Sequence, residues 1–185
     1  MSRAWFTADL HFGHRSILGY TDRPFTDLDD MKMHLVSTWN RHVRRTDDVY
    51  VLGDFSFEPR AVAASTFAAL NGRKHLIVGN HDGDPTRKLP WETVSHIKTF
   101  RGDGLRIVLC HYPMLTWNNA HHGALHLHGH SHGHLNHLNE HTTRHDCGVD
   151  NHPEFRPFAL EEIVAVFAGR GYAAIDHHAP GETSA

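Results

Sequence analysis

The sequence has few features of a secreted, membrane-spanning or nucleic-acid-coating protein. It contains only two cysteines, and Cys110 lies in an apolar run, which favours a buried free thiol over a disulfide with Cys147. Its apolar runs are too short to cross a bilayer, and Asp9 comes too early for the apolar core of a secretory signal. The formal net charge of -3 gives no general attraction to nucleic acid or to an anionic membrane. We therefore expect a cytoplasmic protein that does not associate with membranes; nucleic acid stays possible as a partner but has no support.

Internal repeats and linkers are also missing. A chain of 185 residues is long enough for one domain with a substantial core and too short for two ordinary ones. We expect one domain over residues 1–178 and a loose tail over residues 179–185.

Histidine is the residue in excess, at 21 of 185 positions, and the segment from His121 to His145 is especially rich in it. Composition alone leaves three interpretations open: a metal site, a histidine-rich surface loop, or a low-complexity tract that stores metal.

Five short apolar runs predict β-strands that are buried on both faces. They cover residues 4–8, 49–52, 75–78, 105–110 and 124–128. Between them, apolar residues three or four positions apart predict helices. One follows a sequence similar to a capping box, Thr26-x-x-Asp29, and presents Leu28, Met31, Leu35, Trp39 and Val43 to the core. A second begins near Pro59, with Val62, Phe67 and Leu70 inward and Gly72 as its stop, and a third carries Leu160, Ile163, Val164 and Phe167. Residues 83–85 and 101–104 are typical of turns. This alternation indicates one α/β domain.

Each predicted strand is followed by an aspartate, an asparagine or a histidine. In open α/β sheets, ligands bind beyond the carboxyl ends of the strands. Turn formation explains an Asp or Asn after one strand, but not such residues after five strands in succession. The residues in question are Asp9, His11, Asp54, Asn80, His111, His130 and His132. Carboxylate, amide and imidazole ligands without thiolate suit manganese, iron, zinc, cobalt or nickel, and one carboxylate can bridge two ions about 3.5–4 Å apart.

These residues occur in the order of the five motifs of the calcineurin-like metallophosphoesterases, which the sequence resembles from Asp9 to His132. The run from Asp9 to His14, with Gly148-Val149-Asp150 and Pro157, is similar to small bacterial and phage-borne members. The resemblance implies an α/β fold, a four-layer α/β/β/α sandwich of two mixed sheets flanked by helices. It also implies two divalent transition-metal ions, of which manganese is favoured over iron, zinc, nickel or cobalt.

The resemblance further implies a role for each residue. Asp9, His11 and His132 would bind the first ion, Asp54 would bridge both, and Asn80, His111 and His130 would complete the second. His81 would lie beside the scissile phosphate and assist the leaving group, and Asp82 is either its orienting partner or a turn residue.

Substrate contacts are less well defined by the sequence. His14 and Arg60 are the candidates; His14 is equally compatible with a surface or packed position, and for Arg60 a solvated position is the commoner case. Some branches of the family place a phosphate-binding arginine four residues after the bridging aspartate, whereas this chain has Glu58 there. That departure argues against the protein serine/threonine phosphatases. Tyr112 and Trp117 either line a substrate pocket or pack in the core, and we expect most of the other histidines on the surface.

The function implied is hydrolysis of phosphodiesters in small, nucleotide-like substrates, through attack by a metal-bound hydroxide. A phosphomonoesterase or a nuclease with the same centre is the alternative, and a non-catalytic metal-binding scaffold is the alternative from another class. The expected partner is a small phosphoester substrate, and the oligomeric state stays open.

Overall fold

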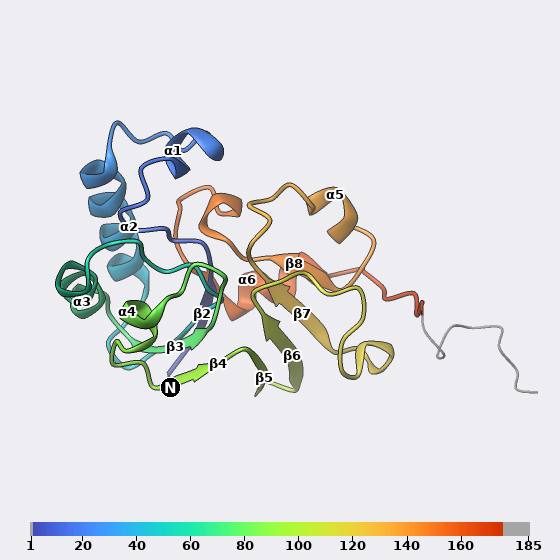
Figure 1. Ribbon diagram of the computed structural model, residues 1–185. Coiled ribbons are helices and arrows are strands. Elements are labelled where there is room, and N and C mark those ends of the chain that lie inside the picture. Colours follow the sequence, from blue (N-terminus) through green and yellow to red (C-terminus); the bar gives the residue numbers. More distant parts are fainter. Residues whose placement is uncertain (1, 176–185) are drawn as a thin grey trace, which may run out of the picture.

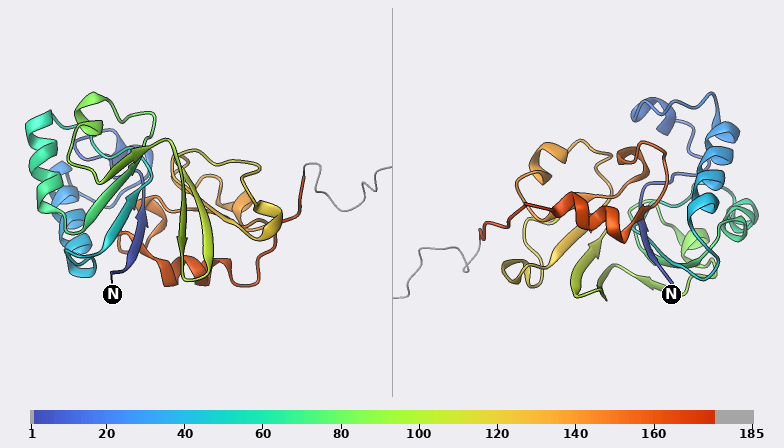
Figure 2. Two further views of the ribbon diagram at one scale, coloured as in Figure 1. Left: turned by 90° about the horizontal axis from the view of Figure 1, so that it is seen from below. Right: turned by 180° about the vertical axis from the view of Figure 1, so that it is seen from behind.

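Two β-sheets lie face to face in the computed structural model, which describes residues 2–175 (Figures 1 and 2). The first sheet has the strand order β4-β3-β2-β1-β9, and the second has the order β5-β6-β7-β8. The strands of the first sheet are β1 (Ala4–Thr7), β2 (Asp48–Val51), β3 (Arg73–Ile77), β4 (Thr93–Ser95) and β9 (Phe158–Ala159). Those of the second are β5 (Ile97–Gly102), β6 (Leu105–Cys110), β7 (Leu125–His128) and β8 (Arg144–Asp146). Both sheets are mixed, because β9 and β5 each run antiparallel to the neighbour they pair with. The tail predicted over residues 179–185 lies outside the described residues.

All five predicted strands are confirmed, as β1, β2, β3, β6 and β7. The four strands without a sequence signal are β4, β5, β8 and β9, and each forms the edge of a sheet. An edge strand pairs on one side only and tends to be short or polar. β4 and β5 are mostly exposed or half-buried, so neither forms a run of apolar residues.

The three predicted helices are α2 (Leu28–His42), α3 (Arg60–Ala69) and α6 (Leu160–Phe167). The cap of α2 lies one residue later than expected, because the carboxylate of Asp27 accepts a hydrogen bond from the N–H of Asp30 at 2.9 Å. Val62 was expected inward, but it is 43% exposed. The turn expected at residues 83–85 is the start of a short helix, in which Pro85 occupies the first turn. The short helices are α1 (Ile17–Tyr20), α4 (Asp84–Arg87), α5 (Asn136–Asn139), η1 (Ala120–His122) and η2 (Val149–Asn151).

Apolar side chains fill three layers around the sheets. Helices α2 and α3 pack their apolar faces on one side of the first sheet. The space between the sheets is filled from both, and α6 packs into the same cluster. On the outer face of the second sheet, Val108 packs against Trp117 and Ala120, so Trp117 belongs to the core. The expected arrangement of two mixed sheets flanked by helices is thus confirmed. Within residues 2–175, no helix combines the length and the apolar character needed to span a membrane.

Candidate metal centre

The carboxyl ends of the central strands of both sheets meet at one edge of the molecule. Hydrogen bonds between the loops hold them there: the N–H of Asp9 donates to Gly53 O, and that of His11 donates to Asp54 O, both at 3.0 Å. In the second sheet the N–H of Gly129 donates to His111 O at 3.0 Å. A bridge between Ala8 and Gly148 joins the segment after β1 to the segment after β8.

Several candidate ligands have an unusual backbone conformation. Among the described residues, the non-glycine positions with positive φ include Asp9 (56°), His11 (51°), Asp54 (55°), His130 (67°) and His132 (47°). The left-handed region is uncommon and unfavourable for residues other than glycine, and such strain concentrates at functional sites. The strand ends are therefore bent in a way that local preference alone does not explain.

Two glycines allow the loops to approach each other. A Cβ on Gly79 would meet Asp54 Oδ1, and a Cβ on Gly53 would meet the ring of His111. Gly53 also has a φ of +91°, which a side chain would oppose. Only glycine therefore fits sterically at the positions that precede Asp54 and Asn80.

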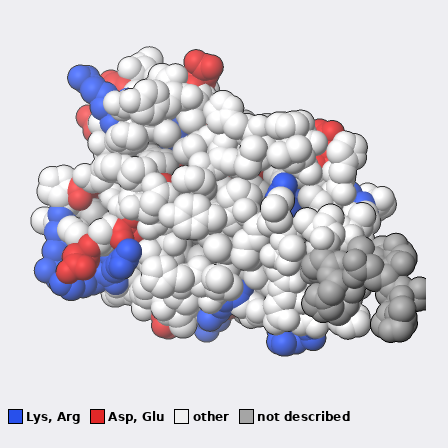
Figure 3. Space-filling model, turned by 45° about the vertical axis from the view of Figure 1, so that its right-hand side comes forward, with Lys and Arg blue, Asp and Glu red and all other residues white. Residues whose placement is uncertain are grey.

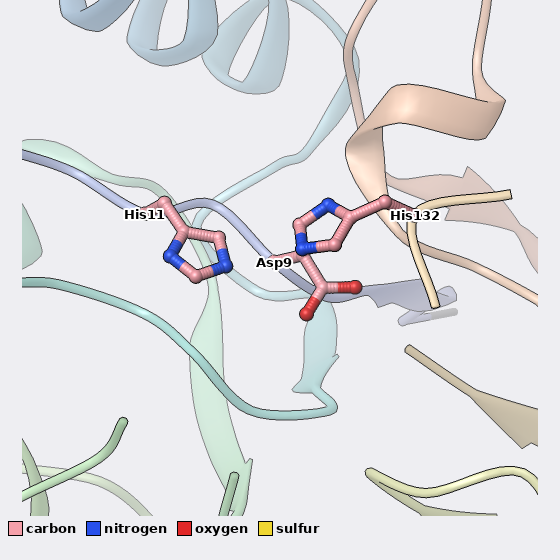
Figure 4. Close-up of side chains that lie close together, drawn as sticks. All are labelled: Asp9, His11 and His132. Atoms are coloured by element: carbon pink, nitrogen blue, oxygen red, sulfur yellow. The ribbon is translucent and has the colours of Figure 1, made fainter. Parts of the chain in front are cut away.

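Asp9, His11 and His132 form one compact group (Figure 4). One ligand atom from each lies within 4.8 Å of the others. His11 is 2% exposed, and neither of its ring nitrogens has a hydrogen-bond partner. Burial lowers the pKa of His11 to about 2, with further lowering from His132 and Arg23, so its ring is neutral and has a nitrogen lone pair for a cation.

Asp54 lies between this group and a second one. Its Oδ2 is 3.6 Å from Nε2 of His11 and also 3.6 Å from Nε2 of His111. The other oxygen, Oδ1, accepts a hydrogen bond from the N–H of His81 at 2.9 Å, which fixes the carboxylate. The second group contains Asp9, Asp54 and His111, so Asp9 is within reach of both groups.

The ring of His111 is oriented from the first sheet. Its Nδ1–H donates to Leu52 O at 2.7 Å, so Nε2 is the nitrogen that faces the site. Asn80 Oδ1 lies 2.9 Å from that Nε2 and is thus next to the same position. His130 is exposed; its N–H donates to the Asp9 carboxylate at 2.9 Å, and its ring centre is 5.1 Å from that of His111. The structure therefore brings all seven predicted ligands to one edge.

Arg23 and Asp150 support the first group, and sequence reasoning gave neither of them a role. Asp150 Oδ2 lies 2.7 Å from Nδ1 of His132, which directs the Nε2 of that ring toward the site. Arg23 forms a two-pronged ion pair with Asp150, at 2.7 and 2.9 Å, and donates to Asp9 O at 2.6 Å. Although burial raises the pKa of Asp150, the hydrogen bonds from His132 and Arg23 hold it well below its ordinary value.

Asp82 does not orient the ring of His81. Its carboxylate accepts three backbone hydrogen bonds, from the N–H groups of Asp54, Phe55 and Gly79 at 2.8–3.0 Å. Because these bonds occupy both oxygens and the side chain is 1% exposed, Asp82 ties the loop after β2 to the loop after β3. The expected partnership with His81 is corrected to this bracing role.

His81 and His14 lie with Phe57 at the rim of the centre. The Phe57 ring stacks on His14 at 4.3 Å between ring centres, and its centre is 4.9 Å from that of His81. Arg60 is exposed at the start of α3, and within the described part of the chain it forms no ion pair or hydrogen bond with the other candidates. Glu58 points away from the centre, because it pairs with Lys32 at 2.9 Å.

Most of the histidines without an assigned role were expected on the surface, but two of them are fully buried. His126 and His128 are both 0% exposed. Nδ1–H of His126 donates to Val108 O, and Nδ1–H of His128 donates to Gly129 O. They brace the second sheet and the loop before His130.

The donor set fits divalent cations. Burial, together with the nearby carboxylates of Asp146, Asp54 and Asp150, raises the pKa of Asp9 well above its ordinary value. A positive charge between Asp9 and Asp54 would relieve that repulsion and give the unpartnered nitrogens of His11 a partner. Mixed oxygen and nitrogen donors without thiolate suit first-row transition metals.

Two curated relatives each match more than two thirds of the chain. No protein-family model matches the sequence. It is 32% identical to the uncharacterized protein MJ1445 of Methanocaldococcus jannaschii over 144 residues, which are 76% of this chain and 74% of that protein. It is also 32% identical to the gene 66 protein of Mycobacterium phage D29 over 160 residues, 71% of this chain and 79% of that one.

One solved structure shares the fold of this chain. The Aquifex aeolicus protein AQ665, of unknown function, superimposes with a TM-score of 0.71 and 23% identity over 90% of this chain and 100% of its own. The Escherichia coli phosphoesterase YfcE matches 70% of both chains with a TM-score of 0.43 and 15% identity. The likeness to AQ665 shows that the two chains have one fold in common.

Proposed function

The chain belongs to the family that includes MJ1445 and the gene 66 protein of phage D29, and we propose that it is a metal-dependent phosphoesterase with a binuclear centre. The single observation that carries this proposal is the position of Asp54. One carboxylate oxygen lies 3.6 Å from a ring nitrogen of His11 on one side and of His111 on the other. An aspartate so placed suits the bridge between two ions.

Two divalent ions, with manganese favoured, would supply activation of water and neutralisation of phosphoryl oxygens when bound. Asp9, His11 and His132 would hold the first ion, and Asn80, His111 and His130 would hold the second, with Asp54 shared. Arg23, Asp150 and Asp82 keep the ligands in place, since they contact ligand side chains or ligand backbone.

His81 is the proposed proton donor to the leaving oxygen. Its main chain is anchored on the Asp54 carboxylate, while its ring is exposed at the rim beside Phe57. The ring is therefore positioned next to the centre yet free to meet a substrate.

A small, nucleotide-like phosphodiester is the substrate class that we propose. Two aromatic side chains remain exposed at the rim, Phe57 at 40% and Tyr112 at 45%. The ring of Tyr112 lies beside that of His130, with 4.9 Å between the ring centres, and Phe57 lies beside His81. Exposed aromatic faces next to a cationic centre suit a phosphate that carries a flat base or aryl group.

The proposal is tested with manganese-loaded protein and parallel panels of phosphodiesters and phosphomonoesters, including cyclic nucleotides and single-stranded DNA. We expect diester hydrolysis and about 10²–10⁴-fold lower kcat for His81→Ala, the range for loss of a general acid. Asp54→Ala should lose both ions and all turnover. His141→Ala, which changes an exposed histidine elsewhere on the surface, is the matched control and should behave as wild type.

The same panel separates the alternatives. Faster cleavage of monoesters would replace the diester assignment, and cleavage of DNA alone would indicate a nuclease. Two tightly bound ions without turnover of any phosphoester would contradict an enzymatic role and favour a metal-binding scaffold.

A further inference from the structure

Two arginines lie directly opposite each other in the β5–β6 hairpin. Arg101 of β5 is the register partner of Arg106 of β6. Side chains of directly paired residues project from the same face of a sheet, with Cβ atoms about 4.5–5.5 Å apart, and like charges at that spacing repel. Because residues alternate along β6, Arg106 shares its face with Val108, which packs on the outer side of the second sheet.

Nothing in residues 2–175 compensates this pair of charges. Neither guanidinium forms an ion pair or hydrogen bond there, and the Nε–H of Arg106 is buried without a partner. Two buried arginines elsewhere each have a partner: Arg144 donates to Asn139 Oδ1 at 2.6 Å, and Arg156 donates to Glu162 at 2.6 and 2.9 Å. Arg106 is half-buried, yet its Nε–H has no partner among the described residues.

Both arginines border a cavity of about 590 Å³ between the hairpin and the turn at η1. Asn119 and His122 line the opposite side, and no aspartate or glutamate is among the lining residues. Gly104 and Gly123 also border it, and a Cβ on either would meet no atom within 4 Å, so the space is open. The hairpin forms part of the lower edge of the molecule in Figure 1, and Lys and Arg side chains lie along that edge in Figure 3.

We propose that this cavity binds a phosphate group of a small anion. A guanidinium group can donate two parallel N–H hydrogen bonds to the oxygens of one phosphate, and two neighbouring guanidinium groups can donate to the same phosphate. A bound dianion would turn the repulsion between Arg101 and Arg106 into a shared attraction. The imidazole of His122 is a further donor when protonated.

The site is separate from the metal centre. Arg106 is the second residue of β6 and His111 follows its end, so the two are roughly 16 Å apart at about 3.3 Å per residue. A molecule held here is therefore a second ligand, either inorganic phosphate or a phosphorylated small molecule, and not the ester bound at the metals.

The experiment measures the melting temperature of metal-free protein while inorganic phosphate replaces chloride at constant ionic strength. We expect phosphate to raise the melting temperature of wild type, as any ligand selective for the folded state does. Arg106→Gln should abolish this rise and should itself melt no lower than wild type in chloride, because it removes a repulsion. Arg41→Gln, the loss of one exposed arginine on α2, is the matched control and should keep the full rise.

Two further arms identify the ligand and exclude the metal centre. Comparison of adenosine monophosphate with inorganic phosphate tells whether a phosphorylated nucleoside binds better, and adenosine is the control without phosphate. Asp54→Ala should retain the phosphate response. Amide resonances of residues 101–106 and 119–124 should shift on titration with phosphate. An equal rise in Arg106→Gln and wild type, or no rise with either phosphate or adenosine monophosphate, would overturn the site. Neither result depends on whether the protein hydrolyses an ester.

Discussion

Replacement of Arg23 should weaken binding of the proposed first metal ion and leave binding of the second unchanged. The guanidinium of Arg23 is 0% exposed and donates to both oxygens of Asp150, to Asp9 O and to Leu10 O, at 2.6–3.0 Å. Asp150 in turn accepts from His132. One buried side chain therefore fixes the backbone of one ligand and the ring of another.

Two substitutions separate the parts of this arrangement. Asp150→Asn keeps the shape but removes the charged acceptor of His132, and loss of such a partner typically weakens metal binding by about 10–100-fold. Arg23→Lys keeps the charge but loses the two-pronged contact and leaves backbone carbonyls of the ligand loop unsatisfied. Breaking a buried ion pair by removing one partner typically costs about 3–5 kcal/mol, so Arg23→Lys, which keeps the charge, should destabilise the protein by less than that.

Arg156→Lys controls for that loss of stability. Arg156 is also largely buried and forms a two-pronged pair with Glu162 at 2.6 and 2.9 Å, but it contacts none of the candidate ligands. Calorimetric titration with manganese at a temperature where all variants are folded gives the affinity of each ion. We expect the first ion to weaken in Arg23→Lys and Asp150→Asn and both ions to bind normally in Arg156→Lys.

Two results would refute this reasoning. Equal loss of manganese affinity in Arg23→Lys and Arg156→Lys would mean that general destabilisation is the cause. Wild-type affinity for both ions in Asp150→Asn would mean that the contact with His132 has no effect on the ligand.

Three other predictions concern the glycines, the pH dependence and the rim. Gly79→Ala should abolish manganese binding and lower the free energy of urea unfolding by about 1–3 kcal/mol through overpacking. Gly83→Ala should be neutral, because its added Cβ meets no atom closer than 3.6 Å. Equal effects of the two substitutions would contradict steric crowding at Gly79. Burial raises the pKa of Glu162, but hydrogen bonds led by that from Arg156 lower it to about 2. Ionised Glu162 contributes about 1 kcal/mol to the free energy of unfolding, since the carboxylate is partly exposed. This contribution is complete above pH ~4.3 and is lost as the pH falls to about 2. The unfolding free energies of metal-free wild type and Glu162→Gln should therefore converge near that pH. Phe57→Ala should lower kcat/KM roughly 10-fold to 10²-fold with two ions still bound, because its ring packs on three histidines of the site, and Phe57→Leu should lose less.

The central strands and the ligands after them could be predicted because both depend on local sequence. A strand buried on both faces must be apolar along its length, and the residue after it is placed at the edge by the strand itself. Asp9, Asp54 and Asn80 follow three such strands of the first sheet and needed no knowledge of distant contacts. The edge strands lacked this signal, since a strand with one partner and an exposed face need not be apolar.

The residues that hold the ligands could not be predicted because they act across long distances in the chain. Arg23 and Asp150 are 127 positions apart, and neither lies in a pattern that requires the other. The role of Asp82 was missed for a related reason: its neighbours in sequence suggested a partner of His81 or a turn residue, whereas its carboxylate accepts hydrogen bonds from three backbone N–H groups, two of them from the loop after β2.

The costs of this fold are concentrated at the edge where the ligands meet. Left-handed backbone at Asp9, His11 and His132, an unpartnered imidazole at His11, and facing carboxylates at Asp9 and Asp54 each oppose folding of the metal-free chain. The core beneath them consists of buried apolar side chains and contains none of these features. One change, the arrival of cations between these side chains, would satisfy the nitrogens and neutralise the carboxylates. Bound cations would compensate the unpartnered nitrogens and the facing carboxylates at this edge together. A metal centre therefore explains their arrangement better than folding stability does.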